Sequence, residues 1–296
     1  MVWGVECKSG ISTKMSSDYI VKRISADVSC LGEGIFFCAK SNCLYWLDIL
    51  NSKLFRYSLV DNTQNKIDLG HHPSVILAIN DNELLYIDSI GVKSYDLLTN
   101  NCHTLCIHLE HNTEKFRAND GVILSNGDIC YGTMGYEPQQ KTGKIYYLQS
   151  FKNPIIMDFG IHIPNGFVEF ENKLLITDSL SKIIYQFDTS ECGLTNKTVW
   201  ADMSDKSYTP DGGFISKSGF LHFALWDGYA VLVMDKQANI VNRIDLPIPR
   251  PTNCVLVDNR WLYVTSATEG LDNGVIQKYP YSGSTLVVDL GENYAF

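Results

Sequence analysis

The sequence of 296 residues predicts an all-β fold, a six-bladed β-propeller with four-stranded antiparallel blades. A polar, turn-like motif recurs along the chain, and its clearest copies are about 46 residues apart, which is typical of propeller blades. Short strand-like segments follow each copy, and no helical pattern exceeds a turn or two. The six copies are Gly32-Glu33-Gly34, His72-Pro73-Ser74, Asn119-Asp120-Gly121, Ile163-Pro164-Asn165-Gly166, Pro210-Asp211-Gly212 and Pro251-Thr252-Asn253.

Each repeat is expected to contain an apolar first strand after the motif, then a stronger second strand and a third strand, joined by hairpins. The expected second strands are Leu44–Ile49, Leu84–Asp88, Ile129–Met134, Leu174–Asp178, Leu221–Trp226 and Trp261–Ser266. The expected third strands are Leu54–Ser58, Val92–Asp96, Lys144–Leu148, Ile183–Asp188, Ala230–Asp235 and Thr285–Asp289.

The sixth repeat runs out after its third strand, so its fourth strand must come from elsewhere. Tyr19–Ser25 is strand-like, and its pairing with the last repeat would close the ring and cover two sheet edges. We therefore expect a single propeller domain over residues 19–296. Residues 1–18 have no strand periodicity and no signal-peptide pattern, so we expect them to form a flexible tail.

Charge and cysteine content limit the expected partners. The formal net charge of −9 argues against nucleic acid and against an anionic membrane, because both require a basic face. Nine Cys without a Cys-x-x-Cys pair favour a reduced, cytoplasmic protein. The expected partner is a small neutral molecule or a cation, and the expected state is a monomer or a weak homo-oligomer.

The antiparallel order of a blade brings the six motifs to one mouth of the central channel. Three of the side chains delivered there, Glu33, Asn165 and Asp211, are oxygen ligands that suit a hard divalent cation. Asn and Asp also occur in turns for their backbone geometry alone, which is the structural alternative. Glu33 does not fit that alternative, because Glu is a poor turn residue. Ca²⁺ is the favoured ion, with Zn²⁺, Mg²⁺ and Mn²⁺ as alternatives.

Arg117 lies beside the same mouth, where its planar fork suits hydroxyl groups or a carboxylate; a surface salt bridge is its structural alternative. Glu137 is placed in the hairpin above it. The repeated Asp48, Asp88 and Asp178 at the ends of second strands are interpreted as structural caps, and His108-Leu109-Glu110-His111 as part of a connecting loop. Trp226 and Tyr229 are candidates for an aromatic pocket wall, with packing between blades as the structural alternative.

These motifs, in this order, resemble the gluconolactonase or regucalcin-like (senescence marker protein) family. The resemblance runs from about Leu31 to Gly291. The chain departs from the family pattern in three ways: at Ile35, at the pair Phe37-Cys38, and at Asn253. The matching segments are Leu31-Gly32-Glu33-Gly34, Leu44–Ile49, Arg117-x-Asn119-Asp120-Gly121, Gly132-Thr133-Met134, Ile163–Gly166, Pro210–Gly212, Ala224–Trp226, Arg250–Cys254 and Leu262–Ala267.

The resemblance implies a lactonase that opens sugar lactones with one divalent cation. It implies the metal ligands Glu33, Asn165 and Asp211, and substrate binding by Arg117, Asn119 and Glu137. We expect Asp211 to act also as the catalytic base that activates water. Two rival functions stay open at the level of sequence: a non-catalytic calcium-binding propeller that acts through protein partners, and a phosphotriesterase-like hydrolase.

Overall fold

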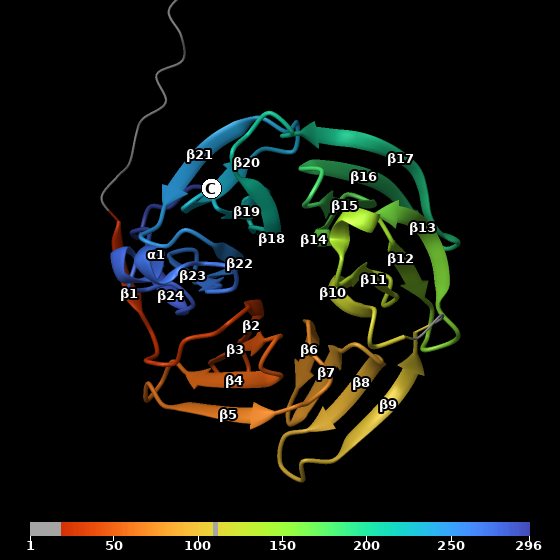
Figure 1. The fold of residues 1–296 in the computed structure, drawn as a ribbon, viewed down its shortest axis with the longest axis horizontal. Helices are drawn as coiled ribbons and strands as arrows, with labels where there is room; N and C mark the ends of the chain where they lie inside the picture. Colours follow the sequence, from red (N-terminus) through yellow and green to blue (C-terminus); the bar gives the residue numbers. More distant parts are fainter. Residues whose placement is uncertain (1–18, 109–111) are drawn as a thin grey trace, which may run out of the picture.

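The computed structural model describes residues 19–108 and 112–296, and it confirms the six-bladed propeller (Figure 1). Six four-stranded antiparallel sheets surround a common axis, with the first strand of each blade innermost. The expected tail, residues 1–18, lies outside the described residues, as do residues 109–111 of the predicted histidine-containing loop. Within the described part of the chain, no helix is long and apolar enough to cross a membrane.

The strands of the first three blades, innermost first, are β2 (Gly32–Cys38), β3 (Cys43–Asp48), β4 (Lys53–Ser58), β5 (Gln64–Asp68); β6 (Val75–Asn80), β7 (Glu83–Ile87), β8 (Gly91–Asp96), β9 (Cys102–Ile107); and β10 (Phe116–Ile123), β11 (Ile129–Gly135), β12 (Gly143–Leu148), β13 (Ile155–Ile161). Those of the last three are β14 (Pro164–Phe170), β15 (Lys173–Asp178), β16 (Ile183–Ser190), β17 (Gly193–Asp202); β18 (Thr209–Ile215), β19 (Leu221–Trp226), β20 (Ala230–Met234), β21 (Ile240–Asp245); and β22 (Pro251–Val257), β23 (Trp261–Ser266), β24 (Leu286–Asp289), β1 (Ile20–Arg23). Two short helical elements, η1 (Pro138–Gln140) and α1 (Asn273–Lys278), lie in hairpins.

The N-terminal strand closes the ring as predicted. Strand β1 pairs antiparallel with β24 as the outermost strand of the sixth blade, with Ile20 opposite Asp289 and Arg23 opposite Leu286. Val21 of β1 packs against a core cluster built from the fifth and sixth blades. The first and last parts of the chain are therefore joined in one sheet.

The recurring motifs are mostly bulges inside strands, which corrects the expectation of turns that precede them. Five motifs lie in β2, β10, β14, β18 and β22 at a register shift, whereas His72-Pro73-Ser74 precedes β6. In β2, for example, Glu33 is opposite Leu47 and Phe36 is opposite Tyr45, so one extra residue is inserted. Turns and bulges require the same backbone conformations, so the sequence signal does not separate them.

Glycines allow the bulges of neighbouring blades to approach closely. Gly166 has a φ of 55°, and a Cβ at this position would lie 2.8 Å from the backbone oxygen of Asp211. A Cβ at Gly212 would lie 2.5 Å from the side chain of Asn253. The polar residues next to these glycines are thereby packed into a tight ring around the axis.

Buried carboxylates at the ends of second strands fasten the loops that lead into the innermost strands. Asp48 accepts hydrogen bonds from the backbone N–H groups of Cys30 (2.9 Å) and Leu31 (3.2 Å). Asp178 accepts equivalent bonds from His162 and Ile163, and His162 Nδ1 also lies 2.9 Å from its carboxylate. The structural interpretation of these aspartates is confirmed.

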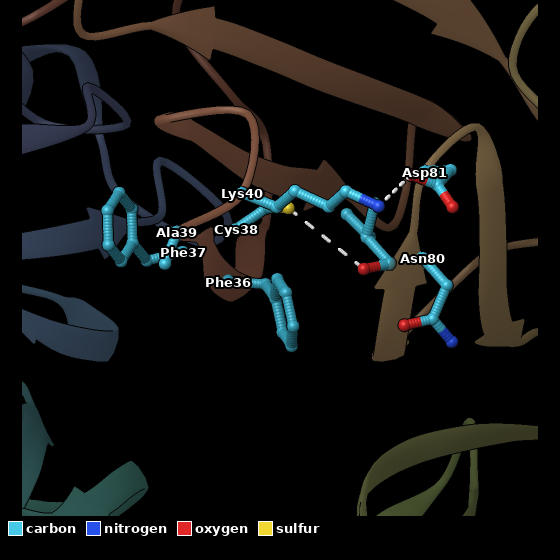
Figure 2. Close-up of a pocket in the computed structure, with 8 residues that line it drawn as sticks. Phe36, Phe37, Cys38, Ala39, Lys40, Asn80 and Asp81 are labelled. Atoms are coloured by element: carbon cyan, nitrogen blue, oxygen red, sulfur yellow. Dashed lines mark hydrogen bonds and ion pairs between the residues drawn. The ribbon is translucent and has the colours of Figure 1, made fainter.

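A pocket of about 240 Å³ lies between the first two blades, where the hairpins after β2 and β6 meet (Figure 2). Lys40 pairs with Asp81 across it, and the Cys38 thiol points toward the backbone oxygen of Ile79 at 4.0 Å. Both contacts join neighbouring blades. None of the predicted site residues lines this pocket.

The C-terminal segment contributes a buried hydrogen bond that leads to a first prediction. Tyr294 Oη lies 2.8 Å from His222 Nε2, and both side chains are buried. Burial lowers the pKa of His222 to about 4, so the ring is neutral. We expect Tyr294→Phe to lower the free energy of unfolding by about 1–3 kcal/mol, because one ring nitrogen loses its partner.

Urea unfolding of purified protein measures this change. Tyr185→Phe is the matched control, because Tyr185 is half-buried and its hydroxyl makes no hydrogen bond with the described residues. Equal stability of the two variants would contradict the role assigned to the Tyr294 hydroxyl.

Candidate active site at one face of the propeller

The predicted site residues converge on a pocket of about 490 Å³. Tyr136, Trp226, Arg250 and Glu269 also line this pocket. Five of the six predicted residues line it: Glu33, Arg117, Asn119, Asn165 and Asp211. The innermost strands of four different blades supply them, which explains how positions far apart in sequence meet.

The bulges aim the three predicted metal ligands at the floor of this pocket. Glu33, Asn165 and Asp211 are exposed to 8%, 5% and 5%. Asn165 Nδ2 donates to Asp211 Oδ1 and lies 3.3 Å from Ser179 Oγ. Ser179 in turn donates to the backbone oxygen of Pro210 (2.9 Å), and Glu33 Oε2 accepts from the Gly34 N–H (3.0 Å). Asn165 and Asp211 are thus linked across two adjacent blades, and Glu33 is held by the backbone of its own bulge.

Negative charge accumulates in this buried region. Burial raises the pKa of both Glu33 and Asp211 well above the usual carboxyl range, and nearby carboxylates add to the shift. Burial also raises the pKa of Asp120, on the same ring, to about 6. Among the described residues, none of the three forms an ion pair within 4 Å. Such a cluster requires protons or a bound cation for neutrality.

The donor set fits a hard divalent cation. Two carboxylates and one amide offer oxygen ligands, and the remaining coordination positions are open to water or substrate. A half-turn flip of the Asn165 amide would place its oxygen where its nitrogen now donates a hydrogen bond. Residues 19–108 and 112–296 contain no group of three His, Cys, Asp or Glu side chains placed to hold a metal ion.

Arg117 and Asn119 form a fixed pair on the wall of the pocket. Arg117 Nη1 donates to Asn119 Oδ1 (2.7 Å) and to the backbone oxygen of Ala118 (2.9 Å). Asn119 Nδ2 donates to the backbone oxygen of Pro164 (3.0 Å) in the next blade. Arg117 is only 7% exposed, yet it forms no ion pair with a carboxylate in the described part of the chain. Its surface-salt-bridge alternative therefore does not hold.

Glu137 is not brought to this pocket. It is exposed, lies directly before η1, and accepts a hydrogen bond from Gln140. The pocket beside it, of about 300 Å³, is a separate one. The helical turn that begins at Pro138 directs the chain so that Tyr136 and Gln139 line the larger pocket instead.

The rim of the pocket contains residues that the sequence did not single out. Arg250 lies over the Trp226 ring at 4.7 Å and donates to Asp227 Oδ1 at 2.7 Å. Trp226 was expected as an aromatic wall, and it does line the pocket, whereas Tyr229 packs against Tyr279 at 5.1 Å. The loop between β23 and β24 contributes Glu269 and Gly270 to the pocket, and no sequence signal identified these residues.

Known proteins resemble this chain over most of its length. The model of the SMP-30/Gluconolactonase/LRE-like region matches residues 31–268. L-arabinolactonase from Azospirillum brasilense is 25% identical over 263 residues, which cover 87% of each chain. Regucalcin from Agrobacterium tumefaciens, described as a calcium-binding protein, has a TM-score of 0.86 at 24% identity, covering 91% of this chain and 93% of its own.

A gluconolactonase from Xanthomonas campestris has a TM-score of 0.73 at 17% identity, with 93% of this chain and 90% of that chain covered. At such identities, the likeness to solved structures shows the fold alone.

Proposed function

The chain belongs to the SMP-30/gluconolactonase/LRE-like family, and its distant relatives include sugar lactonases. We propose that it hydrolyses sugar lactones with one divalent cation. One observation carries the proposal: a buried cluster of carboxyl and amide oxygens shares its pocket with a buried Arg117 that has no carboxylate partner among the described residues. A cation site beside an unpaired guanidinium suits a polar, oxygen-rich substrate.

Glu33, Asn165 and Asp211 would hold the cation. Ca²⁺ is the first choice because all three donors are oxygens, with Zn²⁺, Mg²⁺ and Mn²⁺ as alternatives. When bound, the cation polarises the lactone carbonyl and offsets the negative charge that develops on its oxygen.

The chain's own residues supply the proton transfers and the orientation. Asp211 accepts a proton from the water that attacks the carbonyl carbon, and returns it to the ring oxygen when the ring C–O bond breaks. The product is the open-chain hydroxy acid. The guanidinium of Arg117, fixed by Asn119, donates hydrogen bonds to hydroxyl groups and orients the lactone ring.

A non-catalytic calcium-binding propeller is the rival function, and the fold shared with the calcium-binding regucalcin from Agrobacterium tumefaciens is compatible with it. A purely structural ion does not require a buried Arg117 that faces an open pocket. This residue therefore favours the enzyme.

A hydrolysis screen tests the proposal directly. Several aldonolactones are offered to the metal-stripped protein and to the same protein after addition of each cation, with release of acid followed by a pH indicator. We expect cation-dependent hydrolysis of at least one lactone. Stoichiometric cation binding without hydrolysis of any lactone would favour the rival.

Arg117 gives a prediction for substrate binding. We expect Arg117→Leu to lower kcat/KM for hydroxylated lactones by about tenfold to a hundredfold, because a hydrogen bond from a charged donor is lost. Affinity for the cation should stay the same or increase slightly, since a nearby positive charge is removed. Arg23→Leu is the control, because Arg23 is exposed on β1. Unchanged hydrolysis by Arg117→Leu would remove this residue from the site.

The raised carboxyl pKa values predict how pH and cation act on stability. In the cation-free folded protein, the pKa values of Glu33 and Asp211 are higher than in the unfolded chain, where a carboxyl group has a pKa of about 4. Their contribution to stability is therefore fully present below that unfolded pKa, and it is lost as the pH rises through the folded pKa. The cation must displace the retained protons, so it binds better at higher pH. We therefore expect Ca²⁺ to raise Tm more at pH 8 than at pH 5.

Differential scanning fluorimetry at both pH values measures this effect, with Ca²⁺ at about 100 times Kd contributing about 2.7 kcal/mol. The double variant Glu33→Gln/Asp211→Asn should lose the response. An equal rise in Tm at both pH values would contradict the charge cluster as the binding site.

A further inference from the structure

Glu269 lies in the loop between β23 and β24; it is exposed, as Glu137 is, but unlike Glu137 it lines the same pocket as Arg117. Its backbone is fastened on both sides. The Glu269 N–H donates to the backbone oxygen of Cys30 (2.9 Å), and its own carbonyl oxygen accepts a hydrogen bond from Arg250 Nη1. The adjacent Thr268 N–H bonds the same Cys30 oxygen at 3.0 Å. The position of Glu269 is therefore set by the fold.

Arg250 is itself held in place. Its guanidinium lies over Trp226, its Nε donates to Asp227, and its side chain is only 16% exposed. Gly270 follows with a φ of 66°, and a Cβ there would lie 2.9 Å from Arg250 Nη1. The contacts of Arg250 thus join the rim loops of the fifth and sixth blades. The Glu269 carboxylate itself makes no hydrogen bond or ion pair with the described residues.

Arg117 lines the same pocket, where it comes under the electrostatic influence of this carboxylate. In residues 19–108 and 112–296, only Nη1 of the guanidinium makes hydrogen bonds, so the other donors can bind a ligand. Burial lowers the pKa of Arg117, and the negative charge of Glu269 is the largest of the influences that oppose this shift. The two side chains are nevertheless not within the 4 Å of an ion pair in the described structure, so a ligand can occupy the space between them.

The chemistry of the facing groups limits what this ligand can be. It must accept hydrogen bonds from a guanidinium and donate hydrogen bonds to a carboxylate. An anion meets the first requirement but is repelled by Glu269, and a cation meets the second but is repelled by Arg117. Neutral hydroxyl groups meet both, because each hydroxyl is a donor and an acceptor.

We propose that Glu269 is a specificity-determining residue that accepts hydrogen bonds from a vicinal diol of the substrate, while Arg117 donates to the same diol. Glu269 thus takes the place that the sequence suggested for Glu137. This inference rests on the lactonase function proposed above, and it restricts the substrates to lactones that carry adjacent ring hydroxyls.

The test compares two lactones and three single variants. L-arabinono-1,4-lactone carries the diol, and γ-butyrolactone lacks it. We expect Glu269→Gln to lower kcat/KM for the hydroxylated lactone by about tenfold to a hundredfold and to leave γ-butyrolactone unchanged. Glu191→Gln, an exposed residue on the hairpin between β16 and β17, is the matched control and should change neither rate. Glu137→Gln is measured with the same two lactones, so that the effects of the two glutamates on kcat/KM can be compared.

An equal effect of Glu269→Gln on both lactones, or no effect on either, would overturn the inference. So would a selective loss in Glu137→Gln with Glu269→Gln unaffected. If the wild-type protein hydrolyses no lactone, the proposed function fails, and binding then decides the inference separately. Saturation-transfer NMR with 1,4-anhydrothreitol, a cyclic diol with the trans arrangement of L-arabinono-1,4-lactone, should show binding that Glu269→Gln abolishes. Binding no stronger than that of tetrahydrofuran, which has no hydroxyl group, would overturn it.

Discussion

Asp211→Ala is expected to abolish lactone hydrolysis and leave the propeller folded. The substitution removes a ligand of the proposed cation and the proposed base together. Loss of a general base alone typically costs about 10²–10⁴-fold in rate. Asp211 lies in a bulge on the pocket floor and outside the apolar clusters between blades, so we expect the β-sheet circular dichroism to persist.

Initial rates at saturating cation and far-ultraviolet circular dichroism on the same preparation test this expectation. Asp205→Ala is the matched control, because Asp205 is exposed in the connection that leads into β18. If Asp211→Ala fails to fold, Asp211→Asn keeps the side-chain volume and supplies a folded variant. Wild-type turnover by either folded variant would show that the proposed role of Asp211 is wrong.

The recurrence of polar motifs was enough to predict the blade number and most of the pocket. Motifs with a common spacing occupy equivalent positions in equivalent blades, so Asn119, Asn165 and Asp211 had to meet if the propeller closed. The sequence did not distinguish a turn before a strand from a bulge within it. Both use Asn-Gly or Asp-Gly for their backbone conformations, and the difference depends on pairing with the second strand.

The rim of the pocket was less predictable, for a different physical reason. Loops between second and third strands lack the repeat, and their paths depend on contacts between distant residues. Glu269 is positioned by Arg250 and Cys30, and Glu137 is turned aside by the helical turn at Pro138. A single sequence contains both glutamates, and only the contacts show which of them lines the pocket that contains Arg117.

Deletion of the first 25 residues is expected to cause the largest loss of stability. It removes β1, with its four paired positions on β24, and leaves the apolar strand Leu286–Asp289 as an exposed edge. Val21 also leaves the core cluster of the last two blades. We expect Tm to fall by more than about 10 °C, with aggregation during size-exclusion chromatography, because the loss exceeds several kcal/mol.

Deletion of residues 1–14 is the matched control. This segment has no strand periodicity in its sequence, so we expect its loss to change neither Tm nor lactone hydrolysis. Differential scanning fluorimetry of the two truncated proteins separates the effect of β1 from the effect of shortening the chain. If both truncations unfolded at the same temperature, strand pairing between the two ends of the chain would not be what holds the ring closed.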